Sequence, residues 1–97
     1  MAKKELTEVD IKLNVWMGNR FKQLRESAQI SQNELGRQMK VARMTVINVE
    51  NGTQTITSRD LYNASHIIGI HVSEFFPERD ANGEFVSQAE YQALLEA

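Results

Sequence analysis

A short segment near the middle of the chain carries side chains of the types that read the edges of DNA base pairs. With a helical repeat, Val46, Val49 and Glu50 share one face of this segment. The opposite face then holds a mixed set: Met44, Ile47, Asn48 and Asn51. In the DNA major groove, apolar side chains meet thymine methyl groups, arginine pairs with guanine and asparagine pairs with adenine. With Arg43 beside it, this exposed face therefore suits a major groove.

Residues 31–52 are predicted to form two short helices joined by a tight turn. Such a pair needs a small residue where the helices cross, and Gly36 supplies it. Apolar residues surround the crossing at helical spacing: Leu35, Met39, Val41, Val46 and Val49. The segment is thus interpreted as a helix-turn-helix.

One repeated signal predicts three helix starts: a hydroxyl residue caps the helix, and an acid three positions later reaches back to it. The pairs are Thr7 with Asp10, Ser31 with Glu34, and Thr57 with Asp60. Each pair is flanked by apolar residues that fix the entry of the chain: Leu6 with Ile11, Ile30 with Leu35, and Ile56 with Leu61. Because aspartate replaces glutamate in the first and third pairs, we expect these to be weaker than the second.

The fold class is predicted to be all-α, because apolar spacing is helical and no segment alternates with the period of a strand. Pro77 is expected to close a short fifth helix, Asn82–Gly83 to form a turn, and residues 87–97 to form a last helix. Helical spacing explains the large aromatic residues as core or interface residues: Trp16, Phe75, Phe76 and Phe85.

Length, composition and the absence of catalytic motifs exclude several classes of function. The 97 residues, 41% hydrophobic and 25% charged, suit one globular domain. The chain has no cysteine, which excludes disulfides and thiolate chemistry. His66 and His71 match no metal-ligand spacing, and neither paired carboxylates nor a phosphate-binding glycine loop is evident. We therefore expect no enzyme, no cofactor and no bound metal.

No apolar run approaches the length of a membrane span. The N-terminal residues are charged rather than apolar, so we find no secretory signal. These features predict a soluble, cytoplasmic protein.

The net charge of −2 hides a sorting of charge along the chain. Residues 1–19 balance at zero, whereas residues 20–59 hold seven bases and three acids, a balance of +4. Residues 60–97 hold one base and seven acids, a balance of −6. We therefore look for an anionic ligand at the middle of the chain, although charge alone fits solvated faces equally well.

From about Gly18 to Phe76 the chain resembles the Cro/cI-type helix-turn-helix family, also called the xenobiotic-response-element family, of phage repressors and bacterial regulators. Three runs and the following helix, residues 61–69, carry the resemblance: Arg20-Phe21-x-x-Leu24-Arg25, Ser31-Gln32-x-Glu34-Leu35, and Val46-x-x-Val49-Glu50-Asn51-Gly52. The resemblance implies a five-helix, lambda-repressor-like DNA-binding domain over residues 18–76. A helical extension over residues 1–17 and an acidic dimerisation segment over residues 77–97 would flank it. The resemblance further implies a protein of a bacterium or phage, associated with the nucleoid when bound to DNA.

The resemblance also implies roles for single residues. Base contacts would come from the second motif helix, through Arg43, Met44, Ile47 and Asn48. Gln32 would bond a phosphate near the positive end of the first motif helix. Other contacts to the DNA backbone would come from Ser31, Lys40, Thr45, Asn51, Thr53 and Thr55. Arg25 and Glu50 match a buried ion pair with a structural role.

Four positions depart from the family pattern. Gln29 and Lys40 stand at turn positions that are usually glycine, and each costs about 1 kcal/mol if it is left-handed. Ala42 stands where a hydroxyl cap is usual, a loss of about 1 kcal/mol. Gly36 replaces the usual alanine, which keeps the packing close but weakens the helix by about 1 kcal/mol.

These features favour a sequence-specific, dimeric transcriptional regulator, a repressor of phage, plasmid or mobile-element type that reads a palindromic operator in double-stranded DNA. Two alternatives use the same domain: an antitoxin that also binds a toxin protein through its terminal segments, and a restriction-modification controller. A protein-interaction module without DNA is a more distant one. A homodimer is expected through apolar residues of both ends: Leu6, Val9, Leu13, Trp16, Phe85, Val86, Tyr91, Leu94 and Leu95.

Overall fold

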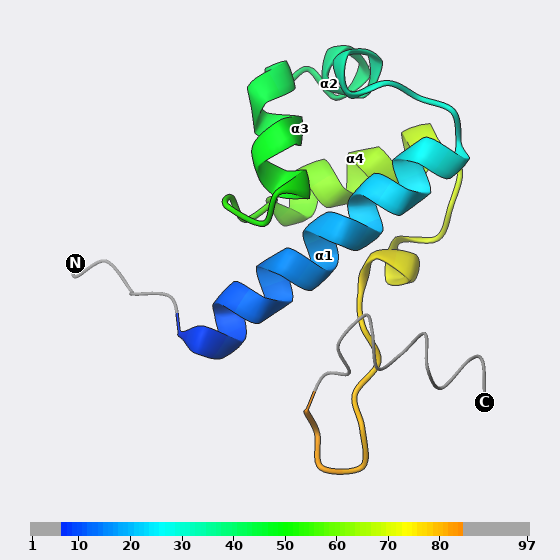
Figure 1. Cartoon of the computed structure of the whole chain (residues 1–97). Coiled ribbons are helices and arrows are strands. Elements are labelled where there is room, and N and C mark those ends of the chain that lie inside the picture. Colours follow the sequence, from blue (N-terminus) through cyan, green and yellow to red (C-terminus); the bar gives the residue numbers. More distant parts are fainter. Residues whose placement is uncertain (1–6, 85–97) are drawn as a thin grey trace.

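The computed structural model of the protein describes residues 7–84. Its elements are four α-helices and one 3-10 helix: α1 (Glu8–Ser27), α2 (Gln32–Met39), α3 (Arg43–Glu50), α4 (Ser58–Ile68) and η1 (Val72–Phe75). This part of the chain holds no strand, so the all-α prediction is confirmed. Helices α2 and α3 lie at one end of the molecule, and η1 lies toward the other end (Figure 1).

The three predicted helix starts are confirmed. Thr7, Ser31 and Thr57 are the N-caps of α1, α2 and α4, and each side-chain oxygen accepts the backbone N–H three residues later, at 3.1, 3.0 and 3.1 Å. Their predicted order of strength was wrong, because the capping box is complete at Thr7, whose N–H donates to Asp10 Oδ2 at 3.0 Å.

At the second start, the acid is engaged elsewhere on its own helix. Glu34 accepts hydrogen bonds from the side chains of Arg37, at 2.9 Å from Nε, and Gln38, at 2.8 Å from Nε2. A charged guanidinium is a stronger donor than a backbone amide. Glu34 therefore bonds Arg37 instead of reaching back to the cap.

Helix α1 runs through Gly18 without a break, so residues 8–17 continue the first helix. Its N-terminal end projects beyond the other helices (Figure 1). Gly18 lies where α1 crosses the end of α3, and a Cβ added there would be 2.3 Å from the carbonyl oxygen of Val49. Glycine is thus needed for this close approach. The division of the chain into residues 1–17, 18–76 and 77–97 stays a prediction.

The five-helix count was wrong, because the segment before Pro77 forms a single 3-10 turn. Helix α4 ends at the left-handed Gly69, and Phe76 is held extended by the proline that follows it (φ −105°, ψ 141°). The few residues between them have room for one turn, which His71 caps by accepting the Ser73 N–H at 3.2 Å. The turn predicted at Asn82–Gly83 is present, whereas Phe85 and the helix predicted over residues 87–97 lie outside the described residues.

The hydrophobic core lies where α1, α2, α3, α4 and η1 meet. Its buried members are Phe21, Leu35, Met39, Val46, Val49, Leu61, Ala64 and Phe75. The rings of Phe21 and Phe75 stack with their centroids 5.5 Å apart. Trp16 is buried as well, whereas Phe76 is 49% exposed. Over residues 7–84, no helix has the length and apolar content to cross a membrane.

Candidate nucleic-acid interface

The turn between α2 and α3 sets the angle at which the second helix leaves the first. Lys40 is left-handed (φ 60°, ψ 40°), and the next N–H, that of Val41, donates to the Gly36 carbonyl at 3.0 Å. An added Cβ at Gly36 would lie 3.1 Å from the Val41 carbonyl oxygen in the turn and 3.5 Å from the backbone of Arg43, so the start of α3 lies close to α2 at this glycine. Gln29 is left-handed too (φ 59°). Both departures from glycine therefore keep the backbone conformation that glycine takes most easily.

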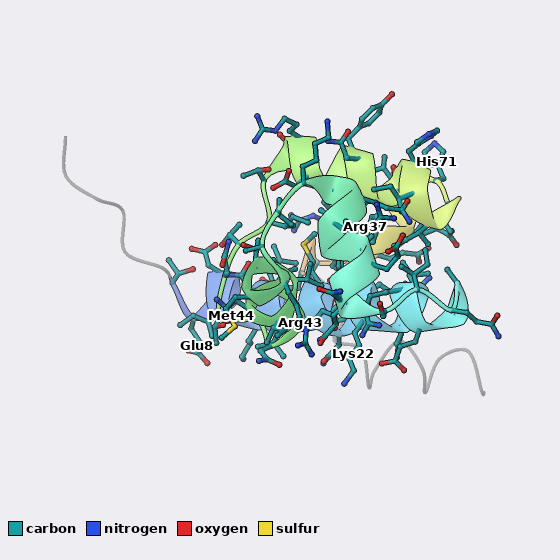
Figure 2. The ribbon with its side chains drawn as sticks, turned by 90° about the horizontal axis from the view of Figure 1, so that it is seen from above. Glu8, Lys22, Arg37, Arg43, Met44 and His71 are labelled. Atoms are coloured by element: carbon teal, nitrogen blue, oxygen red, sulfur yellow. The ribbon has the colours of Figure 1, made fainter. Side chains whose placement is uncertain are left out.

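Helix α3 presents its first turn to the outside. Ala42 is its N-cap and supplies no side-chain hydrogen bond. Arg43 and Met44 extend from α3 on the side away from α4 (Figure 2), and Met44 is 60% exposed. Ile47 and Asn48 are half-buried farther along the helix. The helical repeat puts this set on the face opposite the buried Val46 and Val49.

A buried ion pair holds the other end of α3. Arg25 Nε donates to Glu50 Oε2 at 2.6 Å, and Arg25 Nη2 donates to Oε1 at 3.0 Å. The Arg25 guanidinium also donates to the Ile30 carbonyl at 2.9 Å. The hydrogen bonds to Glu50 outweigh the effect of burial and raise the pKa of Arg25 above its ordinary value. The pair that the resemblance implied is present and ties α1 to α3.

Gln32 joins the same network, a contact that the sequence analysis missed. Its Nε2 donates to Glu50 Oε1 at 3.0 Å. An amide nitrogen carries two hydrogens, so one remains for another acceptor. Ser31, beside it, is exposed and caps α2. No spacing rule joins positions 32 and 50, because the contact exists only once α2 has packed against α3.

The loop after α3 folds back onto α3 and α1. The hydroxyl and backbone N–H of Thr53 both donate to the Asn48 carbonyl, at 3.2 and 3.0 Å. Asn14 Nδ2 donates to Thr55 Oγ1 at 3.1 Å, which links the loop to α1. Two residues predicted to contact the DNA backbone thus use their hydroxyls within the protein. Asn51 and Lys40 are exposed, and Thr45 is half-buried.

Most basic side chains of residues 20–59 are paired with acids. Ion pairs of 4.0 Å or less join Arg20 to Glu74, Lys22 to Glu26, Arg25 to Glu50, Arg37 to Glu34, and Arg59 to Asp60. Lys40 and Arg43 have no such partner among residues 7–84. The uncompensated positive charge of this region therefore lies at the turn between α2 and α3.

The carboxyl group of Glu34 has a strongly lowered pKa. Hydrogen bonds from Arg37 and then from Gln38 lower its pKa from 4.5 to about 2. The charge of Arg37 is accordingly neutralised on the outer side of α2. Within residues 7–84, no three side chains of the metal-binding types gather closely enough to hold a metal ion.

Comparison with known proteins gives a family for this arrangement. The model of the helix-turn-helix family matches residues 21–75, more than half of the chain. No curated protein matches the chain significantly in sequence. The restriction-modification controller protein C.AhdI from Aeromonas hydrophila is similar in structure, with 25% sequence identity and a TM-score of 0.62. The match covers 65% of this chain and 96% of that chain.

Two other solved structures share the fold at lower identity. The hypothetical transcription factor NHTF from Neisseria is 19% identical, with a TM-score of 0.64 over 97% of both chains. Hydroxypropylphosphonic acid epoxidase from S. wedmorenis is 20% identical, with a TM-score of 0.63, and the match covers 79% of this chain but 42% of that chain. The likeness to the enzyme thus spans less than half of its length.

Proposed function

This chain belongs to the helix-turn-helix family of Cro/C1-type DNA-binding transcription regulators, and we propose that it is a repressor that reads a specific operator through α3. The observation that carries the proposal is the unpaired positive charge of Lys40 and Arg43 beside the exposed Met44. DNA phosphates attract such charge. Arginine and apolar side chains supply contacts to guanine and to thymine methyl groups.

The proposed base contacts come from Arg43, Met44, Ile47 and Asn48. The proposed contacts to the DNA backbone come from two sides of α3, through Ser31, Gln32, Lys40, Thr45, Asn51, Thr53 and Thr55. Gln32 keeps one amide hydrogen free for a phosphate while the other holds it to Glu50. Thr53 and Thr55 would have to redirect their hydroxyls, so we expect them to contribute less than Gln32.

The buried network prepares the surface for DNA. Glu50 holds Arg25 and Gln32 together, so α3 and the start of α2 keep a fixed relation before binding. A surface that is ordered in advance loses less conformational entropy on binding. We assign Arg25 and Glu50 a positioning role.

We propose that the protein binds as a homodimer, because members of this fold read half-sites about 34 Å apart. Of the N-terminal apolar stripe, Trp16 is buried within the protomer, which leaves the exposed Val9 and the half-buried Leu13 for a partner. Leu6 and the C-terminal residues 85–97 lie outside the described residues. Val9→Lys should weaken dimerisation in sedimentation equilibrium, whereas Ile11→Lys, at a similar exposed fraction on another face, should not. Equal effects of the two changes would refute this interface.

Selection of genomic fragments by the purified full-length protein tests the proposed function. We expect enrichment of a palindromic site with half-sites about one helical turn apart. Enrichment of fragments without a shared sequence would contradict a sequence-specific regulator. A site in front of a gene, together with lower transcription when the protein is supplied, would distinguish a repressor from an activator.

The similarity to C.AhdI favours a restriction-modification controller as the second candidate, because 96% of that chain is matched. The position of the selected site decides between the two. A site in front of genes for a restriction enzyme and methyltransferase would support a controller. We propose no catalytic role, since the matched enzyme has most of its length outside the shared fold. The proposed place of action is the cytoplasm, where the DNA is.

A further inference from the structure

Met44 is exposed although the other large apolar side chains of α2 and α3 are not. It is 60% exposed, whereas Leu35, Met39, Val46 and Val49 are buried and Ile47 is half-buried. Its side chain extends next to Arg43, away from α4 (Figure 2). An apolar side chain at the centre of the proposed DNA surface gains free energy only if an apolar group covers it.

The major groove offers one kind of apolar group, the methyl on C5 of a pyrimidine. A thioether has no hydrogen-bond donor and is a weak acceptor, so Met44 cannot distinguish bases by their amino and carbonyl groups. Its unbranched, flexible side chain adapts well to a methyl group. Arg43 and Asn48, on either side of it along α3, can form the hydrogen bonds that Met44 cannot.

The acidic side chains of α3 also bear on which bases this helix can read. A carboxylate would accept the amino group of cytosine, and the one carboxylate of α3 belongs to Glu50, which is buried against Arg25. No acidic side chain of α3 is therefore free to read an unmodified cytosine. Contact with a methyl group is therefore the way in which Met44 itself can discriminate between bases.

We propose that Met44 reads the 5-methyl group of one pyrimidine in each operator half-site. This inference rests on the proposed function and adds a preference for a methylated pyrimidine at one operator position. Thymine or 5-methylcytosine is bound more tightly at this position than the corresponding unmethylated base. Binding then responds to cytosine methylation wherever the operator has cytosine at that position.

Single replacement of each operator thymine by deoxyuridine tests the proposal, because it removes the methyl and keeps the base pair. The probe is the duplex that the full-length protein selects from a random library, and the dissociation constant is measured by fluorescence anisotropy. Burial of one methyl group predicts about fourfold weaker binding at one position per half-site, and about 15-fold when both half-sites are changed. At that position, a 5-methylcytosine–guanine pair should bind about fourfold more tightly than a cytosine–guanine pair.

Variants link the effect to one side chain. In Met44→Ala the deoxyuridine effect at that position should disappear, whereas Met44→Leu should keep it. Arg43→Ala is the matched control and should retain the effect while it weakens binding. Met44 is exposed, so these variants should keep the wild-type melting temperature.

The outcomes separate this inference from the proposed function. Tight, selective binding with no deoxyuridine effect at any thymine, or with the same effect in Met44→Ala, overturns the role of Met44 and leaves the regulator intact. A library that yields no preferred sequence overturns both.

Discussion

Glu50 holds two side chains of different roles at once. It accepts two hydrogen bonds from Arg25, through Nε and Nη2, and one from the amide of Gln32, and it is 4% exposed. A buried carboxylate with this many donors is well satisfied, whereas Glu50 without Arg25 would be a buried charge with no cation beside it. Glu50 thus fixes α3 and the start of α2, which would meet DNA, against α1.

Glu50→Ala should lower the free energy of unfolding by about 3–5 kcal/mol, because the buried Arg25 guanidinium loses both of its hydrogen bonds to a carboxylate and keeps only the exposed Glu26, 3.8 Å from Nη2, as an acidic partner. Urea unfolding followed by circular dichroism measures the change. Glu34→Ala is the matched control, since it removes an exposed ion pair with Arg37 and should change the midpoint little. A midpoint shift in Glu50→Ala as small as the control's would contradict the structural role of the pair.

Arg43 and Gln32 should differ in how they affect DNA binding. Arg43→Ala should lose about 1–3 kcal/mol at its own base pair and relax the preference there. Gln32→Ala should weaken binding to all sequences alike, because its partner is a phosphate. Anisotropy titrations with the selected operator and a scrambled duplex measure both. Equal effects of the two variants on both duplexes would count against the assignment.

The depressed pKa of Glu34 predicts a small acid dependence of stability. Its folded pKa of about 2 lies below the ordinary 4.5, so its contribution is present above pH 4.5 and is lost as the pH falls toward 2. Solvent screening keeps this contribution small, because the group is exposed. Carbon-detected NMR titration should give a midpoint near 2, and Arg37→Gln should raise it toward 4.5. An unchanged midpoint in the variant would mean that Arg37 is not the cause.

At the scale of the elements, the helix starts were predictable and several packing contacts were not. Hydroxyl caps are local signals, so Thr7, Ser31 and Thr57 gave the correct starts of three helices. The crossing at Gly36 was predictable too, because both helices lie within one short motif. The helix caps and the crossing glycine were therefore enough to predict where α2 and α3 lie in the chain and that a tight turn joins them.

The sequence could not predict contacts that depend on distant elements. Gly18 is required by the backbone of α3, more than 30 residues away in the chain. The bonds of Gln32 to Glu50 and of Asn14 to Thr55 have the same origin. The short segment predicted as a fifth helix is a single 3-10 turn, Val72–Phe75, because apolar spacing alone does not distinguish such a turn from an α-helix.

The two close glycines should respond differently to alanine. Gly18→Ala puts a methyl 2.3 Å from a backbone oxygen of α3, so we expect a loss of about 3 kcal/mol. At Gly36 the contact is 3.1 Å, and a gain in helix propensity of about 1 kcal/mol offsets the crowding. Thermal unfolding should show a lower melting temperature for Gly18→Ala and one near wild type for Gly36→Ala. Similar melting temperatures for the two variants would refute the close crossing of α1 and α3.

At the scale of the whole molecule, charge is separated along the fold. The unpaired cations Lys40 and Arg43 lie at the end formed by α2 and α3. The acids Glu74, Glu78, Asp80 and Glu84 lie in and after η1, toward the opposite end (Figure 1). A polyanion attracts the first end and repels the second. The net charge of −2 is therefore compatible with DNA binding in one orientation.

The most direct test compares the affinity of the full-length protein for its selected operator and for a scrambled duplex at several salt concentrations. We expect the operator to bind about 10³-fold or more tightly than the scrambled duplex near physiological salt. We also expect Arg43→Ala to reduce this preference strongly. Equal, weak binding of both duplexes with the same steep salt dependence would show phosphate attraction alone. That result would mean that α3 does not read the DNA sequence.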